Sequence, residues 1–298
     1  MQLAGANTGS SVVLSSAAGI ANDAGSLTTA GTLTANAAGG IALNTSVDTA
    51  TLTTSAAGDV AITETDSITL TNVTTSNGSI TVSASGAITA TKVASTTDND
   101  ANDISLTGVG IAATSINAGV AGDLVLDAGA GSITQDGAII ADATTLSAAD
   151  VTLTNVGNTL GTVTLNATGD ANLLTSGALG VKGSVGGNLD ASGTSITATG
   201  LQATNVNFET AGSVSATGLE ADVLQVSAGT GIGVSSVGID HFAAQSASGD
   251  IYMVNTGGYA ISDISTVGGV AFDTELSGVR FTDAAATGKI SLIEIGRA

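Results

Sequence analysis

The sequence of 298 residues predicts an all-β protein, a right-handed parallel β-helix (solenoid) of about 15 coils of 18–20 residues with three short strands per coil. Three observations predict this fold. Short apolar groups recur at a nearly fixed spacing, the residues between them are mostly Ala, Thr and Ser, and proline is absent. An array of β-sandwich domains would repeat near 100 residues, and no such period is present. We therefore expect residues 1–298 to form a single β-helix.

The internal repeat is visible in two parts of the chain. Gly-Asp-Val-Ala-Ile at 58–62 recurs 20 positions later as Gly-Ser-Ile-Thr-Val at 78–82. The offset becomes 18 where Ser-Ile-Thr-Ala-Thr-Gly-Leu at 195–201 matches Ser-Val-Ser-Ala-Thr-Gly-Leu at 213–219. Aligning such units predicts three ladders of stacked apolar side chains. The first is Ile41, Val60, Ile80, Ile104, Leu124, Val163, Leu189, Val206, Leu224 and Phe242; the second is Ile68, Ile88, Ile111, Ile133, Val151, Ile196, Val214, Ile232, Ile251, Val270 and Ile290; the third is Val73, Val93, Ile116, Val156, Leu201, Leu219 and Val237.

Elementary strand geometry explains why such units must stack. Apolar residues at i and i+2 point to one side of a strand, but a strand of three residues cannot bury them alone. Stacking the next coil at the strand spacing of 4.7–4.9 Å buries these side chains in a continuous column. Glycine recurs just before the first strand of a coil, which predicts tight corners with positive φ, at Gly40, Gly58, Gly78, Gly122 and Gly187. The register is least certain over residues 1–40, and it also stays open between Ala171 and Gly187.

One coil is longer than the others, and its extra residues form an acidic segment. The step from Ile80 to Ile104 exceeds the usual coil length, and the excess falls on residues 95–103. We expect this segment to protrude, because the core column has no room for it. Asp98, Asp100 and Asp103 offer the oxygen ligands that calcium prefers. The spacing lacks the glycine and the final glutamate of an EF-hand loop, so a solvated acidic turn is the alternative.

The charge and residue usage exclude several classes of partner. There are 25 acidic and 5 basic residues, giving a net charge of −20. No substantial basic patch can form, so we expect no nucleic-acid partner. No apolar run is long enough for a membrane helix, so we expect no membrane insertion. The chain has no cysteine, and its first residues lack the pattern of a signal peptide. Either a segment not present here exports the chain, or the chain is a fragment of a larger protein.

Aromatic residues are confined to the last third of the chain. Residues 1–200 contain none, and the stretch 240–298 is the richest, so it forms aromatic-richer C-terminal coils and a possible cap. Enzymes that cleave polysaccharides need grouped acids, bases and aromatic platforms, and bases are sparse here. We therefore predict that the protein is not an enzyme. A carbohydrate-binding or carbohydrate-active β-helix using Tyr252 and Tyr259 is an alternative.

The repeats at 58–62, 78–82 and 122–126 resemble the shaft repeats of filamentous-haemagglutinin-type exoproteins. Gram-negative bacteria secrete these proteins through two-partner or autotransporter routes. The resemblance covers most of residues 40–290, and it implies a right-handed β-helix at the cell surface that serves adhesion, biofilm formation or contact between cells. The export domain of the two-partner family carries Asn-Pro motifs, whereas this chain has no proline. It therefore resembles the interior of a shaft.

These observations together predict a non-enzymatic structural shaft of an extracellular bacterial adhesin or surface fibre, located outside the cell or on its surface. The expected partners are neighbouring shaft segments or identical chains placed end to end, and glycans of host or bacterial surfaces. A self-assembling extracellular filament subunit that stacks end to end is an alternative. No cofactor is expected apart from calcium in the acidic turn.

Overall fold

The computed structural model describes residues 1–23, 27–261, 279–281 and 288–295. Over these residues the protein is an all-β parallel β-solenoid of about 14 turns, consistent with a right-handed parallel β-helix, and it contains no helix. The predicted fold class is confirmed. The chain divides into two compact units, Met1–Leu160 and Gly161–Ala298, which are described separately. The expectation that residues 1–298 form one β-helix stays a prediction.

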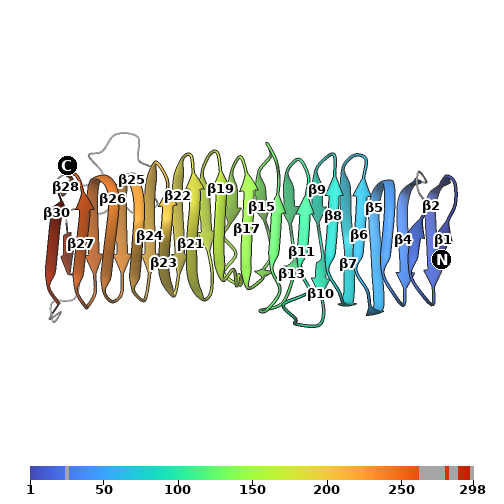
Figure 1. Ribbon diagram of the computed structural model, residues 1–298, viewed down its shortest axis with the longest axis horizontal. Helices are drawn as coiled ribbons and strands as arrows, with labels where there is room; N and C mark the ends of the chain where they lie inside the picture. The colour runs from blue at the N-terminus through green and yellow to red at the C-terminus, as the bar shows by residue number, and fades with distance from the viewer. Residues whose placement is uncertain (24–26, 262–278, 282–287, 296–298) are drawn as a thin grey trace. The chain divides into compact units, whose positions relative to one another are not determined.

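The first unit is a stack of coils built from β1 to β18, coloured blue to green in Figure 1. Its strands are β1 Gln2–Leu3, β2 Asn7–Ser16, β3 Ile20–Asn22, β4 Thr28–Ala37, β5 Ile41–Ala57, β6 Val60–Glu64, β7 Ile68–Asn77, β8 Ile80–Ala84, β9 Ile88–Ala90, β10 Val93–Ser95, β11 Ile104–Thr107, β12 Ile111–Ala113, β13 Ile116–Asn117, β14 Leu124–Asp127, β15 Ile133–Gln135, β16 Ile139–Ile140, β17 Ala143–Ala148 and β18 Val151–Leu153. Three short strands per coil, as predicted, are clearest in β8, β9 and β10.

The predicted ladders of the first unit match the observed register over most of its length. In the first ladder Ile41 pairs with Val60, and the column continues through Ile80, Ile104 and Leu124. In the second, each of the five predicted residues from Ile68 to Val151 pairs with the next. All of these pairs are parallel. The long step between Ile80 and Ile104 is therefore one coil with an enlarged turn, as expected.

Two predicted ladder positions in the first unit are wrong. After Leu124 the first column continues through Thr144, a buried polar residue that donates a hydrogen bond to the Leu160 carbonyl. After Ile116 the third column continues through Ile139, whereas Val156 is 77% exposed. Both errors have the same cause. At Thr144 and at Ile139 the strand has one large inward apolar residue rather than a pair of them at i and i+2, so the apolar pattern used for the alignment is missing there.

The second unit is also a stack of parallel coils (Figure 1). Its strands are β19 Thr162–Ala167, β20 Ala171–Leu174, β21 Ala178–Val185, β22 Asn188–Gly193, β23 Ser195–Gln202, β24 Asn205–Thr210, β25 Val214–Ala228, β26 Ile232–Ser246, β27 Ile251–Thr256, β28 Ala260–Ile261, β29 Val279–Phe281 and β30 Ile290–Ile295. Here the predicted three short strands merge, since β25 and β26 each continue around two corners of a coil. Two glycines with positive φ, Gly200 in β23 (58°) and Gly218 in β25 (65°), lie beside the places where the pairing shifts register.

The register of the second unit corrects the first ladder. Val163 pairs with Val181 and not with Leu189, whose partner in the preceding coil is Ala171. The column from Leu189 then runs as predicted through Val206, Leu224 and Phe242. The segment 171–187, whose register the sequence left open, is thus an ordinary coil.

The second ladder of this unit is as predicted over the described residues, whereas the third is not. Ile196, Val214, Ile232 and Ile251 stack in order, and Ile251 pairs directly with Ile290. Val270, which was predicted between the last two, lies outside the described residues, as does part of the expected cap at 240–298. In the third ladder Leu219 pairs with buried Ser236, and the predicted Val237 is 51% exposed.

The glycines before the first strand have a different role from the predicted one. None of Gly40, Gly58, Gly78, Gly122 and Gly187 has a positive φ. They are needed because successive coils approach closely: a Cβ on Gly58 would lie under 3.0 Å from the backbone of Gly39 and Gly40. Gly78 meets the backbone of Gly58 in the same way. A column of glycines therefore lets the backbones of neighbouring coils touch at this corner.

Candidate functional site

The acidic turn at residues 95–103 is held to the neighbouring coils by hydrogen bonds. The Asp98 carboxylate accepts a hydrogen bond from the Ala121 N–H at 2.9 Å, and the Asp103 carboxylate accepts one from the Asp123 N–H at 3.0 Å. Asp100 is exposed. The buried Asn102 amide anchors the turn by donating to the Asn77 side chain at 2.8 Å.

This arrangement directs two of the three carboxylates to backbone amides of the following coil. Among the described residues there is no group of three or more histidine, cysteine, aspartate or glutamate side chains that could hold a metal ion. The structure therefore does not gather Asp98, Asp100 and Asp103 around one point, and it gives the turn a structural role in joining coils.

The two tyrosines considered for carbohydrate binding lie near the end of the second unit. Tyr252 in β27 is 44% exposed, and its neighbours Ile251 and Met253 are buried in the core. Tyr259 lies in the segment between β27 and β28 and is partly exposed. Both tyrosines lie outside the groove described next.

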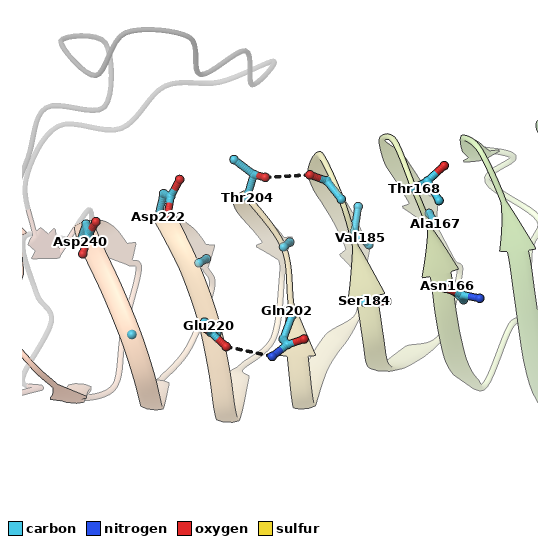
Figure 2. A pocket seen from close by; sticks show the side chains of 14 residues that line it. Asn166, Ala167, Thr168, Ser184, Val185, Gln202, Thr204, Glu220, Asp222 and Asp240 are labelled. Atoms are coloured by element: carbon cyan, nitrogen blue, oxygen red, sulfur yellow. Dashed lines mark hydrogen bonds between the residues drawn. The ribbon is translucent and has the colours of Figure 1, made fainter.

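A groove with a volume of about 740 Å³ lies in the second unit (Figure 2). It crosses five successive coils at the same corner. One wall carries Asn166, Ser184, Gln202 and Glu220; the other carries Thr168, Thr204, Asp222 and Asp240; and the floor between them contains Ala167, Val185, Ala203 and Ala221. Each of these rows repeats every 18 residues.

The hollow shape follows from the alternation of side chains along a strand. The floor residues Ala167, Val185 and Ala221 turn inward and are 4%, 4% and 5% exposed. Their neighbours on both sides, such as Glu220 and Asp222, point outward and are exposed. Because the floor side chains point into the core and the wall side chains point outward, stacking equivalent positions produces a continuous trough.

Hydrogen bonds between coils hold the groove walls in place. The Gln202 side-chain amide donates to the Glu220 carboxylate at 2.9 Å, and the Thr204 hydroxyl donates to the Gly186 carbonyl at 2.8 Å (Figure 2). The lining contains three carboxylates and no basic side chain, and all three carboxylates belong to the two coils at 220–240. The groove can therefore offer hydroxyl, amide and carboxylate groups at a regular spacing, with negative charge concentrated toward one end.

A buried carboxylate lies in the core of the first unit. Glu64 is 1% exposed and occupies an inward position between Thr45 and Ala84 in the neighbouring coils. Burial raises the pKa of the Glu64 carboxyl above its ordinary value of 4.5, while hydrogen bonds from the Val47 and Thr65 N–H groups act in the opposite direction. No pocket residue of the groove touches it, so we regard Glu64 as part of the fold.

The sequence interpretation missed the groove because it left residues 171–187 without a register. Once Ala171 is stacked beneath Leu189, the 18-residue offset places Thr168, Gly186, Thr204, Asp222 and Asp240 in one outward row. The sequence does contain the pattern that forms the groove: a small residue with a polar residue on each side, as in Gln202-Ala203-Thr204 and Glu220-Ala221-Asp222. It could be seen only after the coil boundaries were known.

Comparison with known proteins does not assign a family. No protein-family model, no curated protein and no solved structure matches the chain. Within the described ranges there is also no helix with the length and apolar character needed to cross a membrane. The repeat, the register and the groove are the observations from which function can be argued.

Proposed function

We propose that this chain is a non-enzymatic structural shaft of an extracellular bacterial adhesin or surface fibre. The observation that carries the proposal is the repeated register within each unit: over several successive coils an apolar pair stacks on the pair below it, as in Val60–Ile80–Ile104 and Ile62–Val82–Leu106. Such stacking extends a protein in one direction without a central active site. The resemblance of the repeats to filamentous-haemagglutinin-type shafts supports the same function and an extracellular or cell-surface location.

The location can be tested in the bacterium that produces the protein. An epitope inserted after Asp100 lies in an exposed turn outside the core column, so it should leave the stack intact. We expect antibody to label intact cells, and external protease to remove the label. Labelling that appears only after the cells are made permeable would refute an extracellular shaft. Deleting the chain should reduce adhesion to other cells or to surfaces.

A filament subunit is a second candidate, and a specific observation favours it. In β30 the ladder residues Ile290 and Leu292 are 43% and 36% exposed, although their partners Ile251 and Met253 are fully buried. Within the described residues the printed pairing of β30 is with β27, and a strand of a second copy could pair along its other edge. A second copy that continued the stack would cover both the edge and the apolar side chains.

Sedimentation and negative-stain microscopy over a range of concentrations test this candidate. If copies join at β30, Ile290→Asp with Leu292→Asp should abolish filaments and leave the single chain folded. Ser291→Asp is the matched control, because Ser291 alternates with these two residues and is already exposed. A chain that stays monomeric at all concentrations would exclude the filament.

A further inference from the structure

The groove of the second unit has the dimensions of a site for a linear polymer. It crosses five coils, and at 4.7–4.9 Å per coil this gives a length of about 19 Å. The spacing between coils is close to the advance of one sugar residue in an extended polysaccharide. By contrast, an extended peptide advances by only about 3.3 Å per residue, so its side chains would fall out of step with the walls. A sugar chain along the groove would meet an equivalent pair of wall positions at each residue.

The chemistry of the walls also favours a sugar. Asn166, Ser184 and Gln202 on one side, and Thr168 on the other, provide amide and hydroxyl groups that donate and accept hydrogen bonds. Sugar hydroxyl groups need both kinds of partner. Between the walls, Ala167, Val185 and Ala221 turn inward, so no side chain of these three residues protrudes into the trough where a sugar ring would lie.

Charge selects among sugars. Glu220, Asp222 and Asp240 lie in the groove without any lysine or arginine in its lining, and the whole chain carries a net charge of −20. An acidic polysaccharide would be repelled, and a neutral one would leave the carboxylates without a charged partner. A polymer carrying ammonium groups is attracted, and it can form charge-assisted hydrogen bonds with the carboxylates.

We propose that this groove binds a linear polysaccharide carrying free amino groups, with the sugar chain running across the coils from Asn166 toward Asp240. The coils at the 166–204 end contact the sugar hydroxyl groups, and Glu220, Asp222 and Asp240 bind the ammonium groups. This binding activity goes beyond the shaft function and does not depend on it, since a chain found inside the cell could still bind the polymer through this groove.

Calorimetry with the full chain and a defined oligosaccharide tests the proposal. The probe is a glucosamine hexamer, used at low salt and at a mildly acidic pH where its amino groups are protonated. We expect it to bind, with an affinity that falls as salt is added. The fully acetylated hexamer has the same length without the charge and should bind at least about tenfold more weakly. If the glucosamine hexamer does not bind, or binds no better than the acetylated one, the proposal is wrong.

Two variants and a control distinguish the groove from general electrostatic attraction. Glu220→Gln with Asp222→Asn removes two charges from the wall, and Thr204→Trp places a large side chain at an exposed wall position without changing the charge. Each should weaken binding about tenfold or more. Asp48→Asn with Glu209→Gln removes two exposed charges outside the groove and should leave the affinity unchanged. Equal weakening in this control, full binding by Thr204→Trp, or equally tight binding of a hexalysine peptide would overturn the proposal. Circular dichroism of each variant verifies that it is folded.

Discussion

The direction in which a side chain points decides how its substitution acts in this protein. Ile80 is fully buried in the first ladder, whereas Thr81 is exposed on the outer side of the same strand. Ile80→Asp places a charge without a partner in the core column. We therefore expect the free energy of unfolding to fall by about 4 kcal/mol, or the variant to fail to fold. Thr81→Asp should change it by less than about 0.5 kcal/mol. Urea denaturation followed by circular dichroism measures both, and equal effects would contradict the assigned facing.

Glu64 gives the first unit a pH dependence of known sign. Because burial raises the pKa of its carboxyl above 4.5, the folded state holds the proton more tightly than the unfolded state does. The contribution of Glu64 to stability is therefore greatest below pH 4.5, and it is lost as the pH rises through the pKa of the folded state. The side chain of the Glu64→Gln variant cannot ionise, so this variant does not lose stability in this way as the pH rises.

The measurement for Glu64 is the difference in urea midpoint between Glu64→Gln and the original chain. We expect this difference to shift in favour of the variant as the pH rises from 4.5 toward neutrality. The difference, rather than either midpoint, isolates Glu64 from the other carboxylates. A difference that is constant with pH, or that shifts toward the original chain, would show that the burial of Glu64 does not determine its ionisation.

Within each coil, glycine determines how closely the elements stack. A Cβ on Gly58 would meet the backbone of Gly39 and Gly40, which cannot move without separating two coils. We expect Gly58→Ala to lower the free energy of unfolding by about 1–3 kcal/mol. Gly233 in β26 is the control, because no atom lies within 4 Å of its Cβ position and its φ is not positive. Thermal unfolding should show a lower midpoint for Gly58→Ala and little change for Gly233→Ala.

The strands with paired apolar residues were predictable, and the single-residue sides were not. Ile68 and Ile88 each begin an i, i+2 pattern, so their stacking could be derived from the sequence. Ile116 and Ile139 lie in strands of two residues, where no alternation is available, and the alignment chose Val156 instead. A recurring glycine showed that a small residue was needed, but the sequence could not distinguish a positive φ from close contact between coils. The groove depends on several coils at once, and it therefore required the full register.

At the scale of the whole molecule, the coil is the unit that can be removed. Deleting residues 58–77 takes out one complete coil of the first unit and places Gly78 and Ile80 where Gly58 and Val60 were. Since the remaining coils keep their facing and their ladders, we expect a folded protein with unchanged circular dichroism per residue. Deleting only residues 68–77 removes part of a coil and should prevent the stack from forming. Proteolysis distinguishes the two, with resistance expected for the first deletion and rapid cleavage for the second.

The parallel register has a consequence for how the chain acquires its structure. Strand pairs within each unit join neighbouring coils, as Val60 pairs with Ile41 in one coil and Ile80 in the next. No strand pair within a unit therefore has to wait for a distant part of the sequence. A polypeptide that emerges slowly from a ribosome or a narrow pore can lay down its early coils as a template before the later ones are available. Because each added turn hinders the chain from sliding back, folding itself can pull the remaining length forward.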